Sequence, residues 1–141
     1  MIATADIDPN YLVVHQGDIQ AVANALWAGG AEAMTIQGQR VIATTGIKCV
    51  GNTVVLHDVP YSPPYVISAI GDPVALLTSL EDNPYLVHHY FPWAAQYQLG
   101  YAVDARTHLQ MSGFSGSPEL RYAHPAGSAG TTPGRDPQDP T

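Results

Sequence analysis

Residues 17–72 read GDIQAVANALWAGGAEAMTIQGQRVIATTGIKCVGNTVVLHDVPYSPPYVISAIGD, a helix signal followed by a series of strand signals. Asp18 is a residue type that favours the N-cap of a helix. Apolar side chains then recur at helical spacing, at Ile19, Val22, Ala23, Leu26 and Trp27. Gly29 and Gly30 follow, and glycine often ends a helix in the left-handed conformation. The pattern predicts one amphipathic helix that ends at these two glycines.

Runs rich in β-branched and aromatic residues flank this helix on both sides. We expect strands at residues 11–15, 31–36, 40–44, 46–50, 53–57 and 65–70. Gly51 and Asn52 suit the turn of a hairpin within this series. Residues 58–64 contain three prolines and are expected to form a loop outside any central strand. A last strand or strand pair is expected within residues 98–111.

Two further helices are predicted in the second half of the chain. Asp72 and Pro73 match the N-cap and first position of a helix, whose apolar residues are Val74, Leu76, Leu77 and Leu80. Residues 85–97 have helical character, but Pro92 must break or kink that helix because proline lacks an N–H group.

The predicted order of elements is typical of a split βαβ arrangement. We therefore expect an α+β domain, a ferredoxin-like sandwich with a mainly antiparallel sheet, helices on one face and an inserted β-hairpin. Residues 11–123 are assigned to this single domain and residues 1–10 to a leader or linker. Residues 124–141 are expected to form a flexible tail, since this segment rich in Pro and Gly buries too little apolar surface to order itself. Phe114, Leu120 and Tyr122 are expected to dock part of residues 112–123 on the domain.

The charge distribution excludes several classes of partner. The formal net charge is −7, and the five basic residues are scattered along the chain. A surface that binds nucleic acid or anionic lipid needs clustered cations, so neither partner is expected. Charged residues make up only 12% of the chain, which suggests either an extracytoplasmic setting or a surface solvated by neutral polar side chains. The sequence has no apolar run of the roughly 20 residues that span a bilayer and no signal peptide.

The titratable residues show no pattern that identifies a reaction. The six histidines lack the spacings of metal ligands, and adjacent residues such as His88 and His89 point about 100° apart on a helix. His15 is interpreted as a structural hydrogen-bonding residue, with a ligand contact or general base as the alternative. A hydrolase built on His15 would need a carboxylate within hydrogen-bond reach of it. No nucleophile motif, separated carboxylate pair or phosphate loop is found, so we expect no catalytic residue, cofactor or metal.

Three further features are open to two interpretations. Cys49 lies in an apolar run and is expected to be a small buried hydrophobe, whereas an intermolecular disulfide would need exposure. Asn24 is interpreted as a buried amide bonded to the backbone of the hairpin, or else as the polar lining of a cleft. Tyrosines and tryptophan are frequent between residues 61 and 101, where they either anchor an interface or cap a small core.

Four segments resemble a known family. They are the helix pattern VVHQxDxQAVxNALWAxGAEA, the tripeptide at residues 38–40, GIKCVGNT and PPYVISAIGD. Over residues 11–111 the chain resembles domain-of-unknown-function family 881, the YlxW-like proteins of Gram-positive bacteria that are often labelled division initiation proteins. The resemblance implies a single-pass membrane protein in which this domain follows a membrane helix and a coiled coil and lies outside the membrane. It supplies no catalytic residues to transfer.

We therefore expect a non-enzymatic extracytoplasmic domain, anchored in the cell membrane through a segment that this chain lacks. Its expected partners are envelope or division proteins, in cell division or cell-wall assembly, with self-association as a further option. The alternative is a domain that binds a small molecule or peptidoglycan fragment, for which a deep cleft lined by His15, Asn24 and Trp27 would be evidence. The residues expected to form the binding surface are His15, Gln16, Asn24, Arg40, Asn52 and Tyr61.

Overall fold

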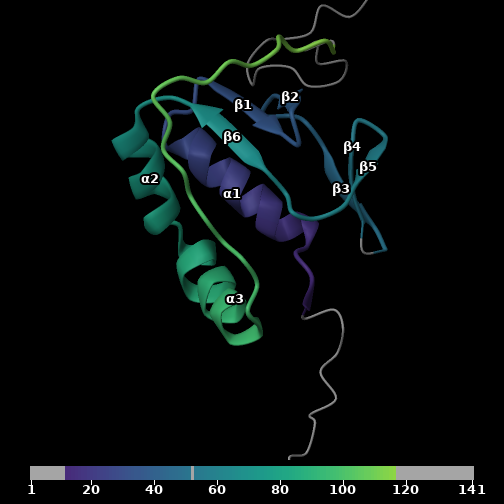
Figure 1. Ribbon diagram of the computed structural model, residues 1–141, viewed down its shortest axis with the longest axis vertical. Helices are drawn as coiled ribbons and strands as arrows, with labels where there is room; N and C mark the ends of the chain where they lie inside the picture. The colour runs from purple at the N-terminus through teal and green to yellow at the C-terminus, as the bar shows by residue number, and fades with distance from the viewer. Residues whose placement is uncertain (1–11, 52, 117–141) are drawn as a thin grey trace, which may run out of the picture.

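The computed structural model describes residues 12–51 and 53–116 as helices and antiparallel strands, which confirms the α+β class (Figure 1). The elements in chain order are α1 (Gln16–Ala28), β1 (Ala33–Ile36), β2 (Gln39–Val41), β3 (Ile47–Val50), β4 (Thr53–Leu56), β5 (Val59–Tyr61), β6 (Ile67–Ile70), α2 (Pro73–Glu81), the π-helical turn η2 (Leu86–Tyr90) and α3 (Phe91–Tyr97). Within the described ranges, no helix combines the length and apolar character needed to cross a membrane.

Helix α1 begins earlier than its sequence predicts. The N-cap is His15 rather than Asp18, and Asp18 lies in the first turn. Its carboxylate oxygen Oδ2 accepts a hydrogen bond from the His15 main-chain N–H at 2.8 Å, which satisfies a donor that the start of the helix leaves unpaired. A strand was expected at residues 11–15. The described residues 12–15 form no strand, because His15 is the N-cap of α1. The end of α1 is as predicted, with Gly30 at φ +87°.

The strands form two sheets rather than the single sheet of a ferredoxin-like sandwich. One sheet has the order β2-β1-β6 and the other has the order β3-β4-β5, and every pair within them is antiparallel. The second sheet is a local meander inserted between β2 and β6. It arises because His57 and Asp58 adopt positive φ angles of 48° and 63°, which turn the chain directly back on β4. The expected single sheet is replaced by these two sheets, of which only the second is formed by consecutive strands.

The loop expected at residues 58–64 is partly wrong, because Val59–Tyr61 form strand β5. Pro60 lies opposite Val55 in the ladder between β4 and β5. It has no N–H to donate, but β5 is an edge strand, where proline is tolerated and discourages further pairing. The prediction that the prolines stay out of a central strand is confirmed.

Glutamine side chains join the two sheets. Gln37 accepts a hydrogen bond from the Val66 N–H at 2.8 Å and donates to the carbonyl of Pro64 at 3.2 Å. Gln39 donates through Nε2 to the hydroxyl of Tyr61 at 3.0 Å, which links β2 to β5. The Gln37 contacts fix the loop between β5 and β6 against the turn of the first hairpin, and the Gln39 contact joins the two sheets.

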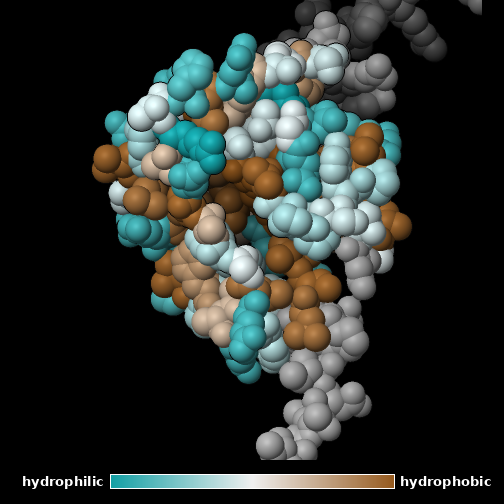
Figure 2. Space-filling model, viewed as in Figure 1, coloured by the Kyte–Doolittle hydropathy of each residue, from teal (hydrophilic) through white to brown (hydrophobic). Residues whose placement is uncertain are grey.

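The core lies between α1, the two sheets and the C-terminal helices. Buried residues of α1, including Ile19, Ala23 and Leu26, pack with the strand residues Met34 and Leu56. Helix α2 starts as predicted, with the Asp72 side chain accepting from the Ala75 N–H at 2.9 Å. The helical piece at residues 85–97 is interrupted, since the π-turn η2 gives way to α3 next to Pro92. Of the predicted apolar face of α2, Leu76 and Leu80 are buried, whereas Val74 and Leu77 are exposed, and Figure 2 shows brown side chains over this helix.

The strand expected within residues 98–111 is not observed. Gln98 ends α3 in the left-handed conformation, and the chain then runs past α2 toward the strands without joining a sheet (Figure 1). The segment is held at its far end, where Arg40 Nη1 donates to the Ser112 carbonyl at 3.0 Å and the rings of Phe114 and His57 lie 6.3 Å apart. The described part of residues 112–123 thus docks as predicted. Leu120, Tyr122 and the expected tail, residues 124–141, lie outside the described residues.

Candidate functional site

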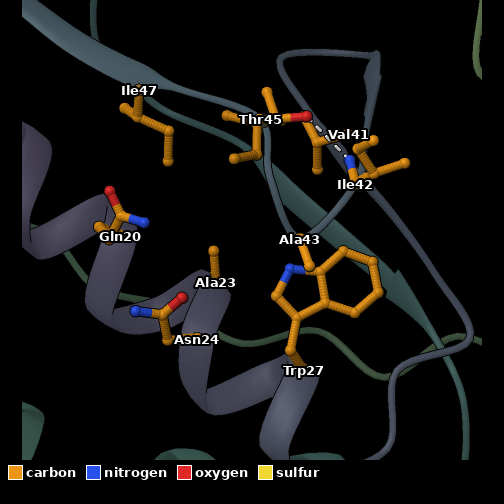
Figure 3. A pocket seen from close by; sticks show the side chains of 10 residues that line it. Gln20, Ala23, Asn24, Trp27, Val41, Ile42, Ala43, Thr45 and Ile47 are labelled. Atoms are coloured by element: carbon orange, nitrogen blue, oxygen red, sulfur yellow. Dashed lines mark hydrogen bonds between the residues drawn. The ribbon is translucent and has the colours of Figure 1, made fainter. Parts of the chain in front are cut away.

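The cleft beside Asn24 and Trp27 that would have favoured the small-molecule alternative is almost filled. Gln20, Asn24 and Trp27 project from α1 toward residues 41–47 (Figure 3), but the space between them is only about 10 Å³, room for about one water molecule. The segment opposite is closed by a hydrogen bond from the Ile42 N–H to Thr45 Oγ1 at 2.9 Å. This site is too small for a ligand, and His15 does not line it.

Gln16 makes the contact with the hairpin that was expected of Asn24. Its Oε1 atom accepts a hydrogen bond from the main-chain N–H of Cys49 at 2.7 Å, and its own N–H lies 3.2 Å from the Cys49 Sγ atom. Asn24 is exposed, so its predicted role as a buried amide is wrong. The expectation that Cys49 is buried is also wrong, since β3 is an edge strand and buries only Ile47.

A larger hollow, the His15 hollow, lies where the start of α1 meets η2 and α3. Its volume is about 530 Å³ and it is open to solvent. The residues that line it are His15, Asp18, Tyr85, His88, His89, Tyr90, Pro92, Trp93 and Gln96. Pockets that bind small ligands commonly have volumes of about 300–1,000 Å³. The hollow is therefore the candidate functional site within the described part of the chain.

A buried carboxylate forms the floor of the hollow. Asp18 is only 5% exposed, and its Oδ1 atom accepts a hydrogen bond from the Tyr85 hydroxyl at 2.8 Å. Its Oδ2 atom accepts the His15 main-chain N–H, so both oxygens are engaged within the chain. Burial, and then the hydrogen bond to Asp18, raise the pKa of Tyr85 to about 12. Tyr85 therefore stays protonated at neutral pH and holds the carboxylate in place.

Aromatic rings form the walls. The rings of His15 and Trp93 lie 6.0 Å apart, those of Tyr85 and His89 lie 5.5 Å apart, and those of Tyr90 and Trp93 meet edge to face at 5.9 Å. Such contacts favour a fixed arrangement of the rings. Burial, followed by the negative charge of Asp18, also raises the pKa of Tyr90. The walls thus combine apolar ring surfaces with polar hydroxyl, imidazole and amide groups.

The hollow lacks the geometry of a general base paired with a carboxylate. The Nδ1 atom of His15 lies 3.8 Å from Asp18 Oδ2, beyond hydrogen-bond distance. Tyr85 is a poor nucleophile because its pKa is raised. In the ranges described, no group of three or more His, Cys, Asp or Glu side chains is arranged to hold a metal ion.

The residues expected to bind together lie in separate places. His15 lines the hollow, Gln16 contacts β3, and Asn24 lines the small space beside Trp27. Arg40 and Tyr61 contact Ser112 and Gln39 on the strand side. Asn52 lies outside the described residues. Neither of the two cavities contains more than one of the five described residues.

Sequence reasoning missed most of the hollow. The main omissions are Tyr85, His89 and Trp93, which follow His15 by about 70 residues or more. The available signal was the concentration of tyrosine, tryptophan and paired histidine between residues 85 and 97, but nothing in the sequence linked that segment to the start of α1.

The fold and the hollow together define a small α+β domain with an open, amphipathic hollow. The chain belongs to the family described as "Bacterial protein of unknown function (DUF881)", whose model matches residues 2–124. This match confirms the resemblance to the YlxW-like proteins. The family description assigns no activity.

Two relatives illustrate the extent of the match. UPF0749 protein YlxW of Bacillus subtilis is 42% identical over 71 residues, which cover 50% of this chain and 31% of that protein. UPF0749 protein Rv1823 of Mycobacterium tuberculosis is 38% identical over 64 residues, which cover 45% of this chain and 21% of that protein. The chain therefore spans less than a third of the length of these relatives.

A solved structure shares the fold. An uncharacterized conserved protein from Mycobacterium tuberculosis superposes with a TM-score of 0.62 at 25% sequence identity. The alignment covers 84% of this chain and 82% of that one.

Proposed function

We propose that this domain is a non-enzymatic binding module that holds a segment of a partner protein in the His15 hollow. In this proposal the domain lies on the outer side of a cell membrane, as part of a longer anchored protein that acts in cell division or cell-wall assembly. The observation that carries the proposal is the hollow itself, which is open, is walled by aromatic rings and has a buried carboxylate at its base that already accepts hydrogen bonds at both oxygens.

The chemistry of the walls favours a peptide over a charged small molecule. Trp and Tyr are enriched among the residues that contribute most to protein–protein binding. The hollow contains no Lys or Arg to attract an anion. Asp18, its one carboxylate, is only 5% exposed and accepts hydrogen bonds at both oxygens, so a ligand in the hollow has little direct access to it. An amphipathic partner segment with an apolar side chain fits Trp93 and Tyr85 best.

The envelope setting rests on the family. The resemblance to YlxW-like proteins implies an anchored domain outside the membrane, and the low share of charged residues, 12%, is compatible with that setting. The absence of a paired general base at His15 supports a binding role over a catalytic one.

The test uses the full-length protein on its own membrane anchor. A photo-cross-linking amino acid is placed at Gln96, on the wall of the hollow, and as a matched control at Ser62, an exposed loop residue that does not line it. We expect one envelope protein to be cross-linked from Gln96 and not from Ser62. Trp93→Ala is expected to abolish that product.

The strand side supplies the competing surface. Arg40→Ala and Tyr61→Ala are expected to retain the cross-link from Gln96, because neither residue lines the hollow. If Arg40→Ala abolished capture while Trp93→Ala retained it, the hollow would be rejected and the surface predicted from the sequence would replace it.

A second candidate ligand is a small molecule such as a peptidoglycan fragment. The volume of the hollow, about 530 Å³, favours it because small-molecule sites commonly have this size. Titration of the domain with soluble muropeptides by NMR distinguishes the two. Shifts confined to the Trp93 indole and the His15 and His89 rings would favour the fragment, whereas an unchanged spectrum with a specific protein cross-link would favour the peptide.

A further inference from the structure

The segment that follows α3 has open backbone edges. Residues 101–110 are all exposed and belong to no helix or strand. No backbone–backbone hydrogen bond joins residues 101–116 to another described residue. The segment leaves α3, passes α2 and reaches the strands as an extended trace (Figure 1). Its N–H and C=O groups are therefore available for pairing.

The same segment has the side-chain pattern of a strand. Apolar residues occupy five of the six odd-numbered positions, at Tyr101, Val103, Ala105, Leu109 and Met111, and Thr107 is the exception. Polar residues occupy the even-numbered positions Asp104, Arg106, His108 and Gln110, and Ala102 is the exception. A period of two is the spacing of a strand with one covered face.

Contacts within the chain distinguish the two sides of this segment. Arg106 donates through Nε to Asp104 Oδ2 at 2.8 Å, so these two side chains, two residues apart, project to the same side as in an extended strand. Both are well exposed, at 65% and 69%. On the other side, the ring of Tyr101 lies 4.9 Å from that of Phe91 and 5.9 Å from that of Tyr90. Tyr101 therefore faces the domain, whereas Asp104 and Arg106 lie on the opposite side of the segment, and Val103 and Leu109 remain exposed.

We propose that residues 101–109 pair antiparallel with the same residues of a second copy of this chain. The two-fold axis passes through Ala105, so that Ala105 faces its own copy and Asp104 lies opposite Arg106 of the second copy. Tyr101 then lies opposite Leu109, and Val103 opposite Thr107. The result is a two-stranded ribbon that joins two domains. This interface is separate from the His15 hollow and does not depend on the function proposed for it.

The charges of Asp104 and Arg106 favour a second copy of this chain as the partner, and they favour one register of pairing. Pairing shifted by one residue would exchange the polar and apolar faces. Shifts of two positions would place Asp104 opposite Asp104, or Arg106 opposite Arg106, and like charges directly opposite are destabilising. Only the register through Ala105 gives two opposite-charge pairs. The segment is thus complementary to itself.

Two of the four edge strands have an obstacle to pairing. On β5, Pro60 removes a backbone donor. On β3, the N–H of Cys49 is already bonded to Gln16. The other two edge strands, β2 and β6, have only three and four residues, so residues 101–109 offer the longest run of unpaired backbone among the described residues.

A cysteine placed on the two-fold axis tests the pairing. Cys49 is exposed and is first replaced by Ser. In that background, Ala105→Cys should form a disulfide-linked dimer on mild oxidation, because directly opposite Cα atoms in antiparallel strands lie about 4.5–5.5 Å apart. Ala102→Cys is the matched control, since residue 102 lies opposite residue 108 and its own copy is about 20 Å away. Equal cross-linking of the two variants, or none, would overturn the proposal.

A charge exchange tests the register in solution. Sedimentation equilibrium of the chain should detect a reversible dimer, and Arg106→Asp should weaken it about tenfold, because two attractive pairs become two like-charge pairs. Asp104→Arg combined with Arg106→Asp should restore the dimer. At a concentration where both proteins are monomeric, far-UV circular dichroism should be unchanged, since these side chains are exposed. A monomer at all concentrations up to about 1 mM, or a dimer insensitive to Arg106→Asp, would reject the proposed pairing.

Discussion

Replacing Asp18 by alanine should destabilise the domain more than any other change to a polar residue in the His15 hollow. Asp18 is 5% exposed and accepts two hydrogen bonds at 2.8 Å, from the Tyr85 hydroxyl and from the His15 N–H. The second contact completes the start of α1. Asp18→Ala leaves both donors without their acceptor while preserving the backbone.

The magnitude follows from the two contacts. Loss of a side-chain acceptor at a helix start costs about 1 kcal/mol. Loss of a hydrogen bond to a charged group costs about 1.5–3 kcal/mol. Tyr85 is 42% exposed, so water replaces part of the second contact and the lower end applies. We expect Asp18→Ala to lower the free energy of unfolding by about 2–3 kcal/mol.

Urea unfolding followed by far-UV circular dichroism measures this loss. Tyr85→Phe removes only one of the two contacts, so its cost should be about 1 kcal/mol. The double variant should cost less than the sum of the two single variants, with a coupling of about 1 kcal/mol, because both changes break the same bond. An Asp18→Ala cost below about 0.5 kcal/mol, or full additivity, would refute the structural role assigned to this carboxylate.

Three further predictions concern Tyr85, Gly29 and Cys49. Tyr85 should titrate near pH 12 in an alkaline absorbance titration, above the usual value of 10. Because its folded pKa is raised, its contribution to stability is complete below about pH 10 and lost as the pH rises toward 12, and Tyr85→Phe should flatten this part of the stability curve. A late-titrating tyrosine that persists in Tyr85→Phe at undiminished amplitude would contradict the assignment. Gly29→Ala should cost about 1–3 kcal/mol of unfolding free energy, because its Cβ would lie 2.8 Å from that of Ser79, where α1 approaches α2. Gly46→Ala, with nothing within 4 Å of the added Cβ, is the control and should be near neutral, and equal costs would reject the close approach. Cys49 should react with a thiol reagent in the native protein, and faster in Gln16→Ala, because that variant loses the hydrogen bond from the Cys49 N–H to Gln16 Oε1, which holds β3 against α1. Labelling only after denaturation would show that the thiol is buried.

Local signals were sufficient for the helices. Ile19, Ala23 and Leu26 are buried as the period of 3.6 residues requires, and Asp72 caps α2 through its side chain. Such features depend on neighbours within four residues, so the sequence alone predicts them. The boundaries were less certain, as the start of α1 at His15 shows.

Pairing between strands was harder to predict. Residues 98–111 have the alternation of a strand, yet they join neither sheet, because alternation indicates a covered face and does not identify a partner strand. The two-sheet arrangement depends on positive φ angles at His57 and Asp58, residue types that do not by themselves require a turn. The burial of Cys49 was predicted wrongly for the same reason, since an apolar run does not indicate which strand forms an edge.

The sequence by itself determined the α+β class, the family, three helical segments and most of the strands, because these rest on periodicity, caps and turns within short stretches of chain. Tertiary structure alone brought His15 and Asp18 against Tyr85, His89 and Trp93, which lie about 70 residues away in the sequence. Packing of the C-terminal helices on α1 creates that proximity. The candidate site therefore follows from long-range contacts, and no local pattern in the chain encodes it.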